Sequence, residues 1–202
     1  WLPCRDVLAW HARATRMIVE EYVNANGHVS QRCLVHPEIL VGGFVLDAAD
    51  WQHLHDDHGV RSVINVCTDQ SDEGKGIPRL AECRVPDDGQ GFTSGLIRIA
   101  VAFAQLSRGF GRVYVHCALG NSRSPAFAYA ILRWVMQLSE GEALACIRQG
   151  KPGLAPYGTH PVQAAYLNSV ESALRLKANS IVMAEKFVAC GMMPIWTQPW
   201  ER

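Results

Sequence analysis

One stretch near the middle of the chain dictates most of what the sequence can fold into. The run Arg112-Val113-Tyr114-Val115 is typical of a buried strand, and the apolar run from Pro125 to about Met136 predicts a buried helix. Between them lies the sequence His116-Cys117-Ala118-Leu119-Gly120-Asn121-Ser122-Arg123-Ser124. A strand that turns sharply into a helix leaves the first backbone N–H groups of that helix unpaired and pointing into the turn. The stretch therefore predicts an anion site at the start of the helix.

The side chains in this turn fit an anion site that also carries a nucleophile. The positive end of the helix dipole stabilises a thiolate at Cys117, and cysteine pKa values fall to about 3.5–7.5 in such settings. Arg123 offers a planar guanidinium suited to two oxygens of a phosphate. Gly120 lets the backbone bend toward a ligand without a Cβ clash. We therefore predict that Cys117 is a nucleophile rather than an inert core cysteine.

Charge and apolar content narrow the class of protein. The chain has 202 residues, of which 49% are hydrophobic, and this is enough for one domain with a substantial core. It has 19 basic and 19 acidic residues, a balance that argues against nucleic acid or an anionic membrane as the main partner. No apolar stretch reaches the length of a membrane span, so none is predicted.

The cysteines point to a reducing compartment. There are seven of them, an odd number, and none forms a Cys-x-x-Cys pair. This pattern disfavours a disulfide scaffold and a structural zinc site. A low-pKa thiol needs reducing surroundings, and no signal peptide is visible, so we expect a cytoplasmic location.

Two helices outside the central stretch carry features that need interpretation. Asp47 or Asp50 is expected to cap a helix that runs to about His58, with His53 and Asp57 on one face. Because no third ligand is evident, we interpret that face as solvated and predict no metal site. A second helix is predicted from Thr93 to Ser107, its buried face formed by Leu96, Ile99, Ala100, Phe103 and Leu106.

The order His-Cys, five residues, Arg-Ser resembles the phosphate-binding loop of cysteine-dependent protein tyrosine phosphatases, in particular the dual-specificity subgroup. The resemblance extends from about Val35 to about Leu174. Within it, Pro37–Gly43 resembles the opening strand pair of that subgroup, and Gly59–Val66 resembles its second core strand. The resemblance implies an α/β fold with a central, mostly parallel twisted sheet of about five strands flanked by helices. It also implies a cysteinyl-phosphate intermediate, hydrolysed by water without a metal or an organic cofactor.

The same resemblance implies roles for the other residues of the loop. His116 orients the loop, and Ser124 donates a hydrogen bond to the sulfur and assists its departure. The phosphate oxygens are bound by the Arg123 side chain and by the loop amides, which belong to Ala118, Leu119, Gly120, Asn121, Ser122 and Arg123.

The chemistry also needs a proton donor for the leaving oxygen of the phosphoester. Relatives carry this acid on a loop about thirty residues before the nucleophile, after an aliphatic-x pair. Val85-Pro86-Asp87 fits that frame, so Asp87 is the first choice. Asp88 is the alternative acid, because relatives differ in the length of this loop. Whichever carboxylate is not the acid belongs to an ordinary Asp-Gly turn.

A second cysteine carries a redox hypothesis. In some relatives a cysteine directly after the Asn-aliphatic pair at the end of the second core strand forms a reversible disulfide with the catalytic thiol. Asn65-Val66-Cys67 matches that pattern. We therefore predict that mild peroxide links Cys67 to Cys117 and protects the thiolate from irreversible oxidation.

Outside the resemblance, the two ends of the chain are read as extensions. Residues 1–30 form a predicted N-terminal helical extension, with an amphipathic helix over residues 5–24. Residues 31–176 form the phosphatase-like domain, and residues 177–202 form a helix with an apolar tail that offers a possible dimer or partner contact. At the pocket rim, relatives have Pro-Asn where this chain has Pro156-Tyr157, which is a departure from the family pattern.

The loop composition bears on the substrate. Ala118, Leu119, Asn121 and Ser122 carry no charge, whereas relatives that act on phosphoinositides or RNA ends tend to have Lys, Arg or His in this loop. A phosphorylated protein, with phosphate on tyrosine, serine or threonine, is therefore the expected substrate. A lipid, inositol or sugar phosphate and a non-catalytic phosphoprotein-binding module remain the alternatives. Sulfur transfer by a rhodanese-like loop is disfavoured by the His-Cys and Arg-Ser flanks.

Overall fold

The computed structural model describes residues 19–23, 29–68, 70–151 and 157–189, with side chains described for 21–23, 29–68, 70–151 and 157–175. In these ranges the chain forms a mixture of strands and helices. The elements are β1 (Val19–Val23), β2 (Val29–His36), β3 (Ile39–Gly42), α2 (Ala48–Asp56), β4 (Val60–Asn65), β5 (Leu80–Glu82), α3 (Ser94–Ser107), β6 (Arg112–His116), α4 (Arg123–Trp134), α5 (Glu140–Gly150) and α6 (Pro161–Ala189).

The strands form one six-stranded sheet in the order β1-β2-β3-β6-β4-β5. The two pairings at the β1 edge are antiparallel, and the three pairings among β3, β6, β4 and β5 are parallel. The expected α/β fold with a mostly parallel sheet is therefore confirmed, although the sheet has one strand more than expected. Strand β6 lies in the middle of the parallel part, and its nearly continuous burial explains its unbroken apolar sequence.

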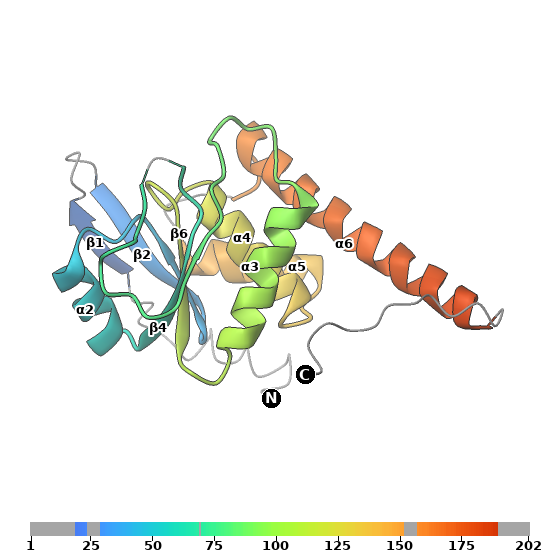
Figure 1. The fold of residues 1–202 in the computed structure, drawn as a ribbon. Coiled ribbons are helices and arrows are strands. Elements are labelled where there is room, and N and C mark those ends of the chain that lie inside the picture. The colour runs from blue at the N-terminus through green and yellow to red at the C-terminus, as the bar shows by residue number, and fades with distance from the viewer. Residues whose placement is uncertain (1–18, 24–28, 69, 152–156, 190–202) are drawn as a thin grey trace.

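Helices cover both faces of the sheet unequally (Figure 1). Helices α3, α4, α5 and α6 lie on one side, and α2 lies on the other. The larger hydrophobic cluster includes Val41, Val115 and Phe127, from β3, β6 and α4. The smaller cluster, on the other face, includes Trp51 and Leu54 of α2. Helix α4 lies deepest, because every residue from Arg123 to Leu132 is buried, and the loop that precedes it is therefore fixed to the core.

Local sequence signals explain where several helices begin. The Asp47 side chain accepts a hydrogen bond from the backbone N–H of Asp50 and caps α2, which decides between the two expected caps. Thr93 caps α3 in the same way. Ser139 and Glu142 form a reciprocal capping box at the start of α5, as the sequence predicts.

Two sequence predictions fail in this part of the chain. The helix predicted over residues 5–24 is wrong at Val19–Val23, which pair with β2 as an antiparallel edge strand, and its other residues lie outside the described ranges. Within α3, Ile99 and Leu106 are exposed, whereas Ala100 is buried and Leu96 and Phe103 pack against the core as expected. The rest of the buried face is formed by Ile97, Val101 and Ala104.

The expected boundary after residue 176 falls inside α6, which runs unbroken from Pro161 to Ala189. No helix in the described part of the chain is both long and apolar enough to cross a membrane. The apolar tail beyond Ala189, with its possible dimer or partner contact, lies outside the described residues.

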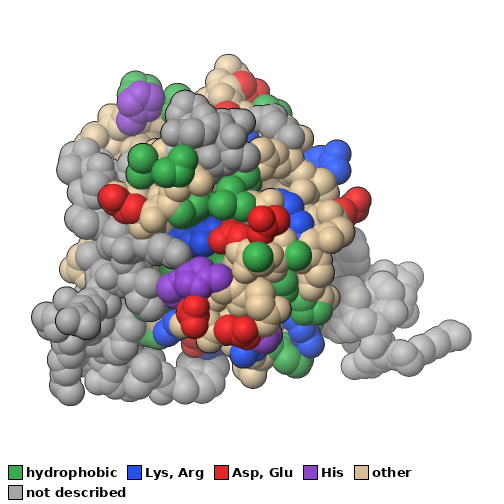
Figure 2. Space-filling view, turned by 90° about the vertical axis from the view of Figure 1, so that its left-hand side faces the viewer, with side chains coloured by type: hydrophobic (Ala, Val, Ile, Leu, Met, Phe, Trp, Pro, Cys, Tyr) green, Lys and Arg blue, Asp and Glu red, His purple; other side chains and the backbone are tan. Residues whose placement is uncertain are grey.

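Histidine and acidic side chains gather on the face of the molecule that α2 occupies (Figure 2). The His53 ring lies 2.5 Å from the Asp57 carboxylate, and the His55 ring lies 2.7 Å from Asp56. These are pairwise contacts at the surface. The described residues contain no group of three or more His, Cys, Asp or Glu side chains arranged to hold a metal ion.

Candidate active site

In the loop between β6 and α4, the Cys117 sulfur lies close to hydrogen-bond donors. The backbone N–H of Gly120 donates to the sulfur over 3.3 Å, and the Ser124 hydroxyl lies 3.4 Å from it. Burial by itself raises the pKa of the Cys117 thiol. The hydroxyl and backbone N–H of Ser124, the charge of Arg123 and the Gly120 N–H outweigh burial, so the pKa lies below the ordinary value of a thiol. Cys117 is therefore poised to ionise.

Strand β3 supplies the platform on which this loop rests. The Gly42 carbonyl accepts a hydrogen bond from the Cys117 backbone N–H over 3.3 Å and another from the Ser124 hydroxyl over 3.2 Å. Gly120 has φ +78°, and a Cβ atom there would lie 2.5 Å from the backbone carbon of Gly42. A side chain at position 120 is thus disfavoured for two reasons: the positive φ is strained for any L-residue, and the Cβ would clash with Gly42.

Arg123 lies at the first turn of α4 and is 2% exposed. One terminal nitrogen donates to the Val85 carbonyl over 2.7 Å, and the other lies 3.3 Å from the Asp87 carboxylate. The Nε atom is buried, and within the described residues it has no hydrogen-bond acceptor. Leaving a buried donor unpaired costs about 1–3 kcal/mol, and a bound oxyanion would satisfy it.

The two candidate acids occupy different positions. The Asp87 carboxylate lies between Arg123 and the Tyr166 hydroxyl of α6, which donates to it over 3.1 Å. Asp88 instead accepts a hydrogen bond from the Gln90 backbone N–H over 2.9 Å, the pattern of an ordinary Asx turn. Of the two, Asp87 is the one whose carboxylate contacts Arg123.

Tyr166 links α6 to the loop that carries Asp87. Burial and the nearby Asp87 carboxylate raise the pKa of Tyr166 to about 12, so its hydroxyl stays protonated and can donate. The ring stacks on Phe92, with the ring centroids 4.4 Å apart. The Gly89 backbone N–H also approaches the hydroxyl, at 3.4 Å. One tyrosine therefore contacts both sides of the Asp87-Asp88-Gly89 turn.

The rim of the site is tied down by three polar contacts. The Tyr157 hydroxyl donates to the Ser122 carbonyl over 2.7 Å, and the Gln163 amide donates to the Asn121 carbonyl over 3.1 Å. On the other side, the Ser30 hydroxyl donates to the Leu119 carbonyl over 3.2 Å. The departure from the family pattern thus places a buried tyrosine, Tyr157, against the loop that follows Cys117. The side chains of Leu119 and Asn121 remain exposed, while Ala118 and Ser122 are half-buried.

His116 and Cys67 both flank the loop from the sheet. His116 is fully buried, and its Nε2 lies 2.5 Å from the carboxylate of Asp72. Cys67 follows β4, whose Asn65 pairs with His116, so the two cysteines lie at the ends of neighbouring strands. Cys67 and Cys117 are both buried free thiols, and the peroxide-induced disulfide between them stays a prediction.

Sequence reasoning missed the residues that position the predicted ones. Asp72, Tyr157 and Tyr166 contact the site, yet each lies more than thirty residues from its partner along the chain. What distinguishes these residues is that their polar side chains are buried, and a single sequence does not reveal burial. Lys151, at the end of α5, was missed for the same reason: its ammonium is fully buried and has no hydrogen-bond acceptor within the described residues.

Solved structures that share this fold are dual-specificity and protein tyrosine phosphatase-like phosphatases, and the chain has their α/β architecture. One is PTPMT1 in complex with PI(5)P, with 18% identity and a TM-score of 0.59 over 72% of this chain and 98% of that one. Another is human DUSP28, with 24% identity and a TM-score of 0.57 over 71% and 95%. A third is a mouse putative dual specificity phosphatase complexed with zinc tungstate, with 22% identity and a TM-score of 0.58 over 73% and 90%.

Comparison by sequence adds nothing to this result. No protein-family model matches the chain, and a search of curated proteins gives no significant match.

Proposed function

We propose that the chain is a phosphomonoester hydrolase that works through a cysteinyl-phosphate intermediate and acts on phosphotyrosine and on phosphoserine or phosphothreonine in proteins. One observation carries the proposal. A thiol with a lowered pKa lies beside a buried guanidinium whose Nε has no acceptor within the described residues. A nucleophile next to a guanidinium that still has an N–H to donate suits the transfer of a phosphoryl group.

In the first step, the Cys117 thiolate attacks phosphorus and forms an S–P bond while the P–O bond to the leaving group breaks. Arg123 and the loop amides bind the equatorial oxygens, where charge is concentrated. Asp87 gives its proton to the leaving oxygen, so the alcohol or phenol departs neutral. The Asp87 carboxyl lies beside Arg123 and is therefore close to the place where that oxygen would be.

In the second step, water attacks the cysteinyl phosphate and the S–P bond breaks. Asp87, now a carboxylate, accepts a proton from that water, and inorganic phosphate is released. The electron pair of the S–P bond returns to sulfur. The Ser124 hydroxyl, which lies 3.4 Å from the sulfur, turns its one proton from the Gly42 carbonyl to the departing thiolate. Both protonation states of Asp87 are thus used once in each cycle.

The neutral rim supports a phosphorylated protein as substrate. None of the residues between Cys117 and Arg123 is charged, and the exposed side chains among them, Leu119 and Asn121, offer apolar and amide contacts. A headgroup with several phosphates would require extra cations at this rim. A phosphorylated side chain requires only one phosphate site and a neutral surface for the flanking peptide.

A non-protein phosphoester is the second candidate, because PTPMT1, which shares the fold, was solved with PI(5)P. Binding of tungstate by the mouse structure supports the shared element of both candidates, since tungstate is a tetrahedral oxyanion like phosphate. Because the residues between Cys117 and Arg123 are uncharged, we favour the protein substrate over the non-protein phosphoester.

The test is hydrolysis of p-nitrophenyl phosphate by the purified chain, followed by a matched panel of phosphotyrosine peptides, phosphothreonine peptides and short-chain PI(5)P. We expect turnover to be lost in Cys117→Ser, which keeps the shape of the side chain, and to fall about 10²–10⁴-fold in Asp87→Ala. Asp88→Ala is the matched control and retains turnover.

Several results would contradict the proposal. Turnover that survives Cys117→Ser would exclude the cysteinyl intermediate. Loss of turnover in Asp88→Ala but not in Asp87→Ala would transfer the acid role to Asp88. A wild-type chain that binds the phosphopeptides without hydrolysing any substrate would be a binding module, and faster hydrolysis of PI(5)P than of any peptide would reverse the substrate assignment.

A further inference from the structure

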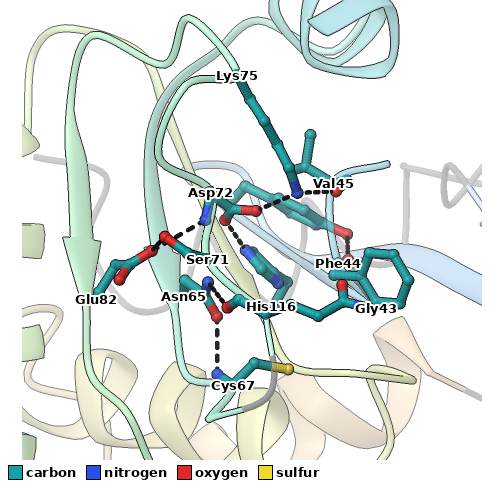
Figure 3. Close-up of polar contacts among 12 residues, drawn as sticks. Gly43, Phe44, Val45, Asn65, Cys67, Ser71, Asp72, Lys75, Glu82 and His116 are labelled. Carbon is teal, nitrogen blue, oxygen red and sulfur yellow. Dashed lines mark hydrogen bonds and ion pairs between the residues drawn. The ribbon is translucent and has the colours of Figure 1, made fainter. Parts of the chain in front are cut away.

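The connection between β4 and β5 places a buried carboxylate behind the phosphate-binding loop (Figure 3). Asp72 is 1% exposed, and one of its oxygens lies 2.5 Å from Nε2 of His116. Its other oxygen lies 2.8 Å from the Lys75 ammonium, which also donates to the Val45 carbonyl. Burying a carboxylate is unfavourable unless it is paired, and Asp72 has a cation or ring nitrogen on each oxygen.

Asp72 is itself held in place by the edge of the sheet. Its backbone N–H donates to the Glu82 carboxylate of β5 over 2.9 Å, and the Ser71 hydroxyl donates to the same oxygen over 2.6 Å. Through Lys75 and Val45 the contacts continue to the segment that follows β3. Figure 3 shows this chain of contacts joining three separate segments at His116. The carboxylate is therefore fixed independently of His116.

The contact determines where the His116 ring carries its proton. A carboxylate only accepts hydrogen bonds, so Nε2 must be the protonated nitrogen. Burial raises the pKa of Asp72, but the hydrogen bond and charge of His116 and those of Lys75 outweigh it and lower that pKa, so the group is ionised at neutral pH. The ring is thereby held one residue before Cys117, at the base of the loop whose Gly120 N–H donates to the sulfur.

We propose that Asp72 is a positioning residue of this site: it fixes the His116 ring with its proton on Nε2 and thereby holds the base of the phosphate-binding loop and favours the Cys117 thiolate. The inference rests on the proposed function in one respect, that Cys117 is the nucleophile. The other groups whose charge or proton acts on the sulfur are Arg123 of α4, Lys151 after α5 and the Tyr157 hydroxyl. None of them contacts Asp72, so its effect can be measured separately.

The test is the rate at which iodoacetamide alkylates Cys117 as a function of pH, followed by the mass of the peptide that contains it. Asp72→Asn preserves the shape of the side chain but removes the charge that holds the His116 ring. Because the loop donors to the sulfur, Gly120 and Ser124, are then less well placed, we expect the midpoint of the profile to rise by about one pH unit. Asp57→Asn is the matched control, because it removes an Asp–His contact of the same 2.5 Å length on the exposed face of α2. It should leave the profile unchanged.

Two further experiments complete the test: a double variant, and an NMR measurement on the wild-type chain. In a His116→Gln background, Asp72→Asn should cause no further shift, since its effect passes through the ring. In the wild-type chain, the ring ¹⁵N shifts of His116, assigned by their loss in His116→Gln, should report a proton on Nε2 at pH 7. This measurement stands even where Asp72→Asn does not fold.

The inference is overturned when the alkylation profiles of Asp72→Asn and wild type superimpose, when the shift persists in His116→Gln, or when the proton lies on Nδ1 alone. These outcomes differ from failure of the proposed function. An inactive wild type with a shifted Asp72→Asn profile would retain the positioning role and reject the phosphatase.

Discussion

At the scale of single residues, several residues in and around the Cys117 loop are held by neighbours that are distant in sequence. Asp87 is held by Tyr166 over 3.1 Å, Ser122 by Tyr157 over 2.7 Å and His116 by Asp72 over 2.5 Å. Each is a hydrogen bond made by a buried or half-buried side chain. Such bonds fix orientation more than they add stability, because a typical one contributes only about 0.5–1.5 kcal/mol net.

Replacing Tyr166 with Phe tests whether the acid is positioned. The change removes the hydroxyl that donates to Asp87 and keeps the ring that stacks on Phe92. We expect kcat to fall about 3–10-fold with little change in KM, which corresponds to one lost hydrogen bond. Tyr129→Phe is the control, since its hydroxyl donates to Glu171 over 2.5 Å two turns into α4. An unchanged kcat in Tyr166→Phe would remove this tyrosine from the account.

Lys151 is a buried charge without a hydrogen-bond acceptor among the described residues. Burial lowers its pKa, while thiolates at Cys33 and Cys117 would raise it. A lysine whose folded pKa is depressed binds fewer protons in the folded state, so its destabilising effect is largest at low pH and disappears as pH rises toward the unfolded pKa. The residue therefore opposes folding at neutral pH and, through its charge, favours the Cys117 thiolate.

Lys151→Met is expected to change stability and reactivity in opposite directions. Urea unfolding at pH 7 should show a gain of about 1–3 kcal/mol, because a buried charge is replaced by an apolar side chain of similar length. The alkylation midpoint of Cys117 should rise, since a nearby positive charge is lost. Lys151→Arg retains the charge and should keep the midpoint at its wild-type value. A less stable Lys151→Met variant would show that the ammonium is satisfied in solution.

At the scale of elements, the strand–loop–helix unit is the part that sequence could predict most fully. The apolar runs of β6 and α4, Gly120 in a tight turn and Pro125 in the first helical turn are local signals, and they agree with one another. Helix α3 shows the opposite case. Both of its faces carry large apolar residues, so the periodicity did not identify which face packs on the core, and Ile99 and Leu106 proved exposed.

The close packing of the Cys117 loop on β3 leads to a prediction for Gly120. A Cβ atom there would lie 2.5–2.8 Å from the backbone of Gly42, and the φ of +78° is strained for any L-residue. Gly120→Ala should therefore displace the loop, abolish turnover and raise the Cys117 alkylation midpoint. Gly141→Ala is the control, because a Cβ at this helical position meets no atom within 4 Å. Retained turnover in Gly120→Ala would show that the loop is not held as described.

At the scale of the whole molecule, the antiparallel edge of the sheet was the feature that sequence predicted worst. The segment Val19–Val23 has the sequence Val-Glu-Glu-Tyr-Val, which has no clear period of either a helix or a strand, and only pairing with β2 decides the outcome. The edge matters for the site because β2 carries Ser30, whose hydroxyl donates to the Leu119 carbonyl. Strand β6 in the parallel half of the sheet, by contrast, followed from its continuous apolar run.

The same reasoning explains which site residues could be found from sequence. Cys117, Arg123, Ser124 and His116 lie in one local motif, and Asp87 lies at a characteristic distance before it. Asp72, Tyr166 and Lys151 reach the site only through the packing of the β4–β5 connection, α6 and α5 against it. Their burial is a property of the folded chain, and no local pattern encodes it.

The central claim is that a phosphoryl group passes through the Cys117 sulfur. The most direct test is to quench the reaction of the wild-type chain with a phosphotyrosine peptide within milliseconds and to locate the phosphate by the mass of the proteolytic fragments. The account predicts a phosphoryl group on the peptide that contains Cys117 and none on that peptide in Cys117→Ser. A phosphoryl group on any other side chain, or turnover in Cys117→Ser, would contradict it.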